Sequence, residues 1–288
     1  MISRRSLLGG AGAALGLGLL PGMTNAAPLA KVKALGAIRI VVYKDNRPWS
    51  WEEGGKLVGL DVDLARAIAG KLDVRADVAE LIADESADDD LRNGVWKGGL
   101  LGFSPGDLML HVPFDRGFAA RNDQVAIIAP YYRESFALAG NGGAVALEGM
   151  PTEWRGRRLA AELDSIPDFY LIGSFGGILA KDVTHYRTGS DAVTALTDGK
   201  ADAVIASRAQ IEEGLSRAGD AARRVTLRKG PLPAFTSPGW DIGMAVKENS
   251  RTLGDAVEEI VSGMAISGEM KALFGRYGVE WKPAQAAG

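Results

Sequence analysis

The chain has 288 residues, 47% of them hydrophobic, a formal net charge of −3 and no cysteine. This length is enough for one large or two medium domains, and the slightly acidic balance argues against nucleic acid as a partner. Disulfides and thiol chemistry are excluded. Two histidines far apart in the sequence give little support to a zinc centre or a histidine-based triad, and we expect no cofactor because no phosphate-binding glycine fingerprint is present.

The first 26 residues have the layout of an export signal. A twin-arginine pattern at Ser3–Leu8 precedes a Gly/Ala/Leu stretch and small residues that end at Ala26. The apolar stretch is too short and too rich in glycine for a good membrane span. An ordinary signal peptide that contains two arginines by chance is the alternative, and both readings predict export. We therefore expect residues 1–26 to be a twin-arginine-type signal peptide and the mature protein to be periplasmic.

The first half of the mature chain begins with a predicted buried strand over 38–42. A glycine turn then leads into a predicted helix over 60–69, whose apolar residues repeat at helical spacing. Asp61 and Asp63 lie in its first turn, where negative charge suits the helix dipole. Further strands are expected over 74–82, 106–112, 124–132 and 134–139, and the acidic segment 84–90 is expected to be solvated.

A second series of strands and helices follows the glycine-rich joint at 140–143. Strands are expected over 158–162, 203–206 and 240–247, and helices from 167, over 190–197, over 209–217 and over 251–264. The alternation of strands with helices predicts an α/β protein with mixed or parallel sheets covered by helices.

Motifs spread over nearly the whole mature chain resemble those of family 3 extracellular (periplasmic) solute-binding proteins. They are Pro48-Trp49, Gly59–Leu64, Gly106-Asp107, Arg121 with Pro130-Tyr131, Gly199–Val204 and Ile242–Val246. The resemblance implies the type II periplasmic-binding-protein clamshell: two lobes, each a mixed sheet flanked by helices, joined by two crossing hinge strands. We place lobe 1 at 27–137 and 241–288 and lobe 2 at 138–240, with crossings near Phe136–Leu138 and near Trp240.

The resemblance also indicates which residues would hold a ligand in the cleft between the lobes. Arg121 matches the family's carboxylate-binding arginine, and its guanidinium offers a planar fork of donors. A surface arginine, or one paired with Asp115 or Asp123, is the alternative. Trp49 and Trp51 are candidates to cover the ligand with their rings, and the alternative for each is a core tryptophan.

Two positions of the second half depart from the family's amino-acid pattern. Ser207 stands where the family has its ammonium-binding aspartate, which argues against a standard α-amino acid as ligand. Ser165 stands near the family's Gly-Thr-Thr helix start. It is expected to cap a helix that has Pro167 in its first turn, and such a helix start could also present backbone amides to an anion.

The stretch from His111 to Arg121 departs from the family as well. Phe118 occupies a position where the family has a hydroxyl, and Asp115 lies in the same specialised cleft wall. His111 is open to three interpretations, namely a pH-sensitive donor, a ligand contact or a satisfied core group. Trp240 completes the candidate ligand-binding residues, beside the second crossing.

These features predict a monomeric periplasmic solute-binding protein rather than an enzyme. It would capture a small polar or anionic solute and deliver it to the membrane subunits of an ABC transporter by hinge closure. The alternative is an accessory protein that binds a periplasmic quinoprotein alcohol dehydrogenase or its cofactor, because the departures are similar to a branch of the family found beside such enzymes. An enzyme on this scaffold would need an acid at the cleft, for which Glu134, Glu162 and Asp115 are conceivable.

Overall fold

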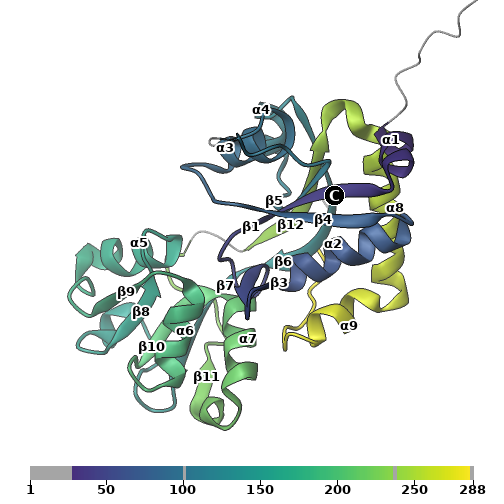
Figure 1. Cartoon of the computed structure of the whole chain (residues 1–288). Helices are drawn as coiled ribbons and strands as arrows, with labels where there is room; N and C mark the ends of the chain where they lie inside the picture. Colours follow the sequence, from purple (N-terminus) through teal and green to yellow (C-terminus); the bar gives the residue numbers. More distant parts are fainter. Residues whose placement is uncertain (1–27, 100–101, 236–238, 286–288) are drawn as a thin grey trace, which may run out of the picture.

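The computed structural model describes residues 28–99, 102–235 and 239–285, so the predicted signal peptide lies outside the described residues. No helix within these ranges is long and apolar enough to cross a membrane. Two bodies built on separate five-stranded sheets lie side by side (Figure 1). We call them the first lobe and the second lobe.

The first lobe is built on a mixed sheet with the strand order β4-β1-β5-β12-β6. These strands span Arg75–Leu81, Ala37–Tyr43, Leu108–Pro113, Trp240–Lys247 and Val125–Glu134 respectively. Strand β1 is parallel to β4 and β5, whereas β12 is antiparallel to β5 and β6. Its helices are α1 (Pro28–Leu35), α2 (Leu60–Lys71), α3 (Ala87–Leu91), α4 (Arg116–Arg121), α8 (Arg251–Ser267) and α9 (Glu269–Gly275), with a π-helical turn over Arg92–Trp96.

Alternation along the strands gives the first sheet two buried faces. Ile40 and Val42 belong to the larger core, under α1, α2, α8 and α9, whereas Val41 joins a smaller core with residues of α3 and α4. The turn before α2 depends on Gly59, which has a φ of +136°. A Cβ there would lie 2.2 Å from the carbonyl oxygen of Trp49, so only glycine lets the helix begin this close to the preceding loop.

The second lobe is built on a sheet with the strand order β11-β7-β10-β8-β9. These strands span Val225–Leu227, Phe136–Asn141, Ala203–Ser207, Leu159–Glu162 and Val183–Tyr186. Strand β10 is parallel to β8 and antiparallel to β7. Its helices are α5 (Ile166–Gly173), α6 (Gly189–Thr197) and α7 (Arg208–Ala218), and a small hairpin of β2 (Trp51–Glu53) and β3 (Lys56–Val58) projects from the first lobe.

The chain passes between the lobes twice. Strand β6 ends at Glu134 in the first sheet, and β7 begins at Phe136 in the second, so the first passage is at Ser135, just before the predicted position. After β11 in the second sheet, the chain is already back in the first sheet at Trp240. The predicted fold class is therefore confirmed: two mixed sheets flanked by helices.

Two local predictions are wrong. The acidic segment 84–90 is not fully solvated, because α3 begins within it and Asp90 is buried, accepting a hydrogen bond from the Tyr43 hydroxyl at 2.8 Å. The glycine-rich joint is shorter than expected, because Gly140 and Asn141 continue β7 and pair with β10 and β11. Hydrogen bonding to a distant strand or tyrosine overrides the local polar composition in both cases.

Candidate functional site

A polar pocket of about 230 Å³ lies between the lobes. From the first lobe, Asp45 and Arg47 of the segment between β1 and β2 line it, together with Trp51, which begins β2. From the second lobe, Arg187 and Thr188 precede α6, and Arg217 comes from α7. Three guanidinium groups from both lobes thus surround one pocket.

Arg47 is held rigidly at the border of the lobes. Its guanidinium carbon lies 4.4 Å from the centre of the Trp51 ring, a cation–π contact, and its Nε donates to Oε1 of Glu213 on α7 at 2.9 Å. Glu213 is buried and also receives Nε of Arg217 at 3.3 Å. The indole N–H of Trp51 and Oε2 of Glu213 are buried without a hydrogen-bond partner among the described residues.

Arg187 is a second arginine of the pocket that contacts the opposite lobe, and it is exposed. Arg187 pairs with Asp45 across the lobe boundary at 3.4 Å, and its side chain is 75% exposed. An exposed pair at this distance contributes little to stability, so the guanidinium can exchange Asp45 for another carboxylate at little cost. This freedom distinguishes Arg187 from Arg47.

The start of α6 adds positive potential on the second-lobe side of the pocket. Thr188 caps this helix by accepting a hydrogen bond from the backbone N–H of Asp191 at 3.1 Å. The N–H of Gly189 donates to Oε2 of Glu162 at 2.8 Å, and burial raises the pKa of that carboxyl group. Cationic side chains beside a helix N-terminus favour a polar solute that carries an anionic group.

The structure places Arg121 elsewhere. It ends α4 in the first lobe, its side chain is 58% exposed, and its Nε donates to Asp88 on α3 at 3.0 Å. The partner of Arg121 is thus Asp88. The alternative in which Arg121 pairs with Asp115 or Asp123 is wrong. Arg121 does not line the pocket described above.

The two tryptophans of the Pro-aromatic segment differ in their surroundings. Trp49 is only 2% exposed and packs in the first-lobe core against the rings of Tyr132 and Phe274, as the core alternative has it. Its ring also lies 4.7 Å from that of His111. Trp51 lines the interlobe pocket.

Three other candidates have structural roles inside the first lobe. His111 Nδ1 lies 3.1 Å from Oδ2 of the buried Asp61, which favours the satisfied core interpretation. Asp115 caps α4 by accepting from the N–H of Phe118 at 2.8 Å, and Phe118 itself is buried in the smaller core. The hydroxyl that the family has at that position is thus replaced by a core ring.

The remaining candidates lie at helix starts and at the passage between lobes. Ser165 caps α5 by accepting from the N–H of Asp168 at 3.2 Å, and Ser207 caps α7 by accepting from that of Gln210 at 3.3 Å. Trp240 stacks obliquely on Phe136, with ring centres 4.8 Å apart. The structure therefore does not bring the nine candidates together in one pocket.

Sequence reasoning missed the arginines that do surround the interlobe pocket. Arg47 directly precedes the Pro-aromatic motif, and that position was a usable signal. Arg187 and Arg217 lie in segments without a motif, and only the approach of the two lobes gives them a common role.

A larger pocket of about 740 Å³ lies at the edge of the first sheet and is lined by first-lobe residues such as Arg39 and Ile82.

The comparisons with known proteins find a likeness in structure only. No model of a protein family and no curated protein matches the chain. Among solved structures, the ancestral cationic amino acid solute-binding protein AncCDT-1 has a TM-score of 0.66 at 17% identity, over 87% of this chain and 99% of that one. An amino acid ABC transporter substrate-binding protein from Streptococcus pneumoniae, bound to L-arginine, has a TM-score of 0.61 at 19% identity, over 88% and 98%.

Another structure of AncCDT-1, described as a precursor of cyclohexadienyl dehydratase, has a TM-score of 0.58 at 16% identity, over 88% of this chain and all of that one. Identities this low show a shared fold and no more. The chain has the two-lobed α/β fold of these amino-acid-binding proteins.

Proposed function

We propose that the protein is a periplasmic solute-binding protein that captures a small polar or anionic solute between its lobes. The solute would then pass to the membrane subunits of an ABC-type transporter, with the protein acting as a monomer. Lobe 1 would comprise 27–135 and 240–288, and lobe 2 would comprise 136–239, because β7 begins at Phe136 in the second sheet and β12 begins at Trp240 in the first. The observation that carries this proposal is the pocket to which both lobes contribute arginine side chains.

The arginine side of the pocket offers a place for the carboxylate of a solute. Arg187 is exposed and only loosely paired, so a bound carboxylate can take the place of Asp45 in front of its planar fork. The N-terminus of α6 beside it favours the same charge. Asp45, Glu52 and Asp191 also line the pocket, and their carboxylates can receive the donor groups of a zwitterionic solute.

The proposal assigns different weights to the sequence candidates. Trp51 would form the aromatic wall of the site. Arg121 as the carboxylate-binding arginine stays a prediction; its exposed pair with Asp88 is displaceable, but Arg121 does not line the pocket that carries this proposal. Trp49 and Phe118 would support the first lobe from its core. Ser165 and Ser207 would act through the helix starts that they cap.

The other functions considered for this chain gain no support from the structural likeness. The accessory role beside a quinoprotein dehydrogenase rests on sequence departures alone. A catalytic role is set aside because the amino-acid-binding proteins named above share the fold, although one of them is described as a precursor of a dehydratase. Binding without catalysis is what the interlobe arginines support best.

Thermal unfolding with a solute panel tests this proposal. The panel contains the common L-amino acids, dicarboxylic acids and polyamines. We expect at least one carboxylate-bearing compound to raise Tm, because binding to the folded state alone stabilises it. The same compound should shift Tm less in Arg187→Ala than in Arg223→Ala, a control arginine of the second lobe whose side chain is 81% exposed and pairs with Asp220. No shift from any compound, or equal shifts in both variants, would contradict the proposal.

A further inference from the structure

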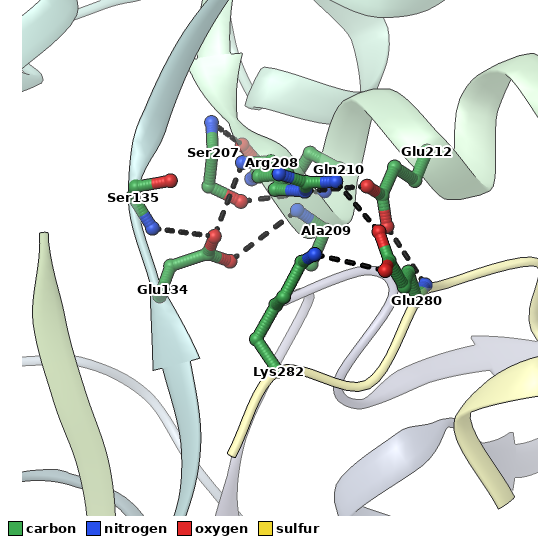
Figure 2. A network of polar contacts seen from close by, with 9 residues as sticks. All are labelled: Glu134, Ser135, Ser207, Arg208, Ala209, Gln210, Glu212, Glu280 and Lys282. Atoms are coloured by element: carbon green, nitrogen blue, oxygen red, sulfur yellow. Dashed lines mark hydrogen bonds and ion pairs between the residues drawn. The ribbon is translucent and has the colours of Figure 1, made fainter. Parts of the chain in front are cut away.

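A buried carboxyl group lies at the passage between the lobes. Glu134 ends β6 in the first lobe and is 1% exposed. Figure 2 shows its carboxylate pointing at the first turn of α7, which belongs to the second lobe. The proposed solute-binding function does not use this group.

Most donors to Glu134 come from the other lobe. Its Oε1 accepts from the backbone N–H of Ser135 at 2.8 Å and from that of Arg208 at 3.1 Å, and Oε2 accepts from the N–H of Ala209 at 3.4 Å. The Ser207 hydroxyl contributes a further hydrogen bond. Three of these donors belong to the second lobe, so the full set exists only while α7 lies against β6.

The same helix carries other contacts between the lobes. Ala209 is buried in the first-lobe core, and Arg208 pairs with Glu280 of the C-terminal segment at 2.8 Å. Glu212 accepts from the backbone N–H of Glu280 at 2.8 Å. The first turns of α7 are therefore the surface on which the second lobe rests against the first.

The charged groups around Glu134 neutralise one another and leave its own charge without a counterion. Figure 2 shows Arg208, Glu212, Glu280 and Lys282 beside it, from α7 and the C-terminal segment, and the nearby titratable groups of β6 and β12 are Tyr132, Arg133 and Asp241. Arg208 is shared by Glu212 and Glu280, Lys282 pairs with Glu280 at 2.8 Å, and Arg133 pairs with Asp241 at 3.2 Å. The Glu134 carboxylate thus has hydrogen bonds but no cation of its own among the described residues.

We propose that Glu134 is a proton-dependent lock between the two lobes. Proton uptake by its carboxyl group favours the arrangement in which α7 packs against β6. Proton loss favours arrangements in which α7 withdraws and water reaches the carboxylate. The inference concerns the hinge alone and does not depend on which solute the protein binds.

The direction of this lock follows from linkage. Burial outweighs the four hydrogen bonds and raises the pKa of Glu134 to about 7. A hydrated glutamate has a pKa of about 4.3, so the packed arrangement binds the proton more tightly than any arrangement that hydrates this group. Acid therefore favours packing, and the bias is lost as pH rises through about 7. Tyr132 does not contribute, because burial raises the pKa of its hydroxyl far above this range.

Distances between spin labels on the two lobes test the lock without ligand. The sequence has no cysteine, so Lys33→Cys on α1 and Lys181→Cys in the second lobe give two unique and exposed labelling sites. We expect a narrow interlobe distance distribution at pH 5.5 that broadens or shifts by pH 8.5, with a midpoint near 7. The same distribution at both pH values would overturn the proposal, and this measurement needs no change at Glu134.

Two variants separate Glu134 from other titrating groups. Glu134→Gln is permanently neutral, so its distribution should stay narrow at both pH values. Glu162→Gln is the matched control, because Glu162 is a half-buried glutamate whose pKa burial also raises and which accepts from a helix start, that of α6, but its contacts lie within the second lobe. It should keep the wild-type pH response. A pH response that persists unchanged in Glu134→Gln would assign it to another group, such as a histidine, and overturn the proposal.

A third variant tests the hydrogen-bond geometry. Ser207 donates to the carboxylate, and its hydrogen bond lowers the pKa of Glu134. Ser207→Ala removes that donor, so the midpoint of the distance change should move to higher pH. A midpoint that moves to lower pH or does not move would contradict the proposed contact between α7 and the lock.

Discussion

The interlobe ion pair of Arg47 offers a sharp energetic test of how the lobes are joined. Arg47 contacts Oε1 of Glu213 through Nε at 2.9 Å and through Nη2 at 2.8 Å. The Glu213 side chain is only 6% exposed, so Arg47→Ala leaves a buried carboxylate whose remaining ion-pair partner is Arg217, at 3.3 Å. The substitution removes one of the two arginines that pair with the buried Glu213 carboxylate.

The expected cost follows from these contacts. Breaking a buried ion pair by removing one partner costs about 3–5 kcal/mol. The remaining contact with Arg217 lowers this figure, and the lost cation–π contact with Trp51 adds about 1 kcal/mol. We therefore expect Arg47→Ala to lower the free energy of unfolding by about 3 kcal/mol.

Urea unfolding followed by tryptophan fluorescence measures this loss, and a double-mutant cycle with Glu213→Gln isolates the pair. The coupling energy should be about 1.5 kcal/mol or more, because Glu213→Gln alone removes the buried charge that Arg47→Ala would leave with Arg217 as its remaining partner. Arg251→Ala, which breaks an exposed pair with Glu248, serves as a control and should leave the urea midpoint unchanged. A coupling near zero would refute the claim that this pair joins the lobes.

Three further predictions concern the core and the hinge. Trp49→Ala should lower the free energy of unfolding by about 3–5 kcal/mol through the cavity that it leaves in the first-lobe core, and a loss under about 1 kcal/mol in urea unfolding would contradict this packing. Asp61→Ala should lower the free energy of unfolding by about 2–4 kcal/mol in the same assay, because it removes the partner of His111 and of the Tyr131 hydroxyl, which lies 2.7 Å from Asp61. The control Asp63→Ala, at a half-buried neighbouring position, should lower it less. Relative to Glu134→Gln, wild-type stability should fall by about 3 kcal/mol as pH rises from about 4 to 8, since the folded state binds the proton more tightly than the unfolded chain; a rise with pH would show the opposite sign for the pKa shift.

Much of the fold could be predicted from residue patterns. The helix over 60–69 and the strand over 38–42 were evident because apolar spacing, the glycine turn and first-turn acids all indicate the same structure. The burial of Asp61 was not evident from the sequence, because an aspartate in the first turn of a helix is normally a surface charge. Its burial depends on Tyr131, which is 70 residues away in sequence.

The site was harder to predict than the fold. Motif matching pointed to Arg121, because the spacing from Arg121 to Pro130-Tyr131 fits the family pattern, but Arg121 is the last residue of helix α4 and its side chain pairs with Asp88. The interlobe pocket instead uses Arg47, Arg187 and Arg217, which come from three distant segments. A site formed between two lobes depends on their relative placement, and no local pattern carries that information.

The central claim is that the two lobes close over a solute held between them. The interlobe distance between spin labels at Lys33→Cys and Lys181→Cys, measured with and without the compound that raises Tm most, tests it directly. Saturation should give a shorter, narrower distribution in the wild type and a weaker response in Arg187→Ala. A compound that binds tightly while the distance distribution stays unchanged would contradict the account.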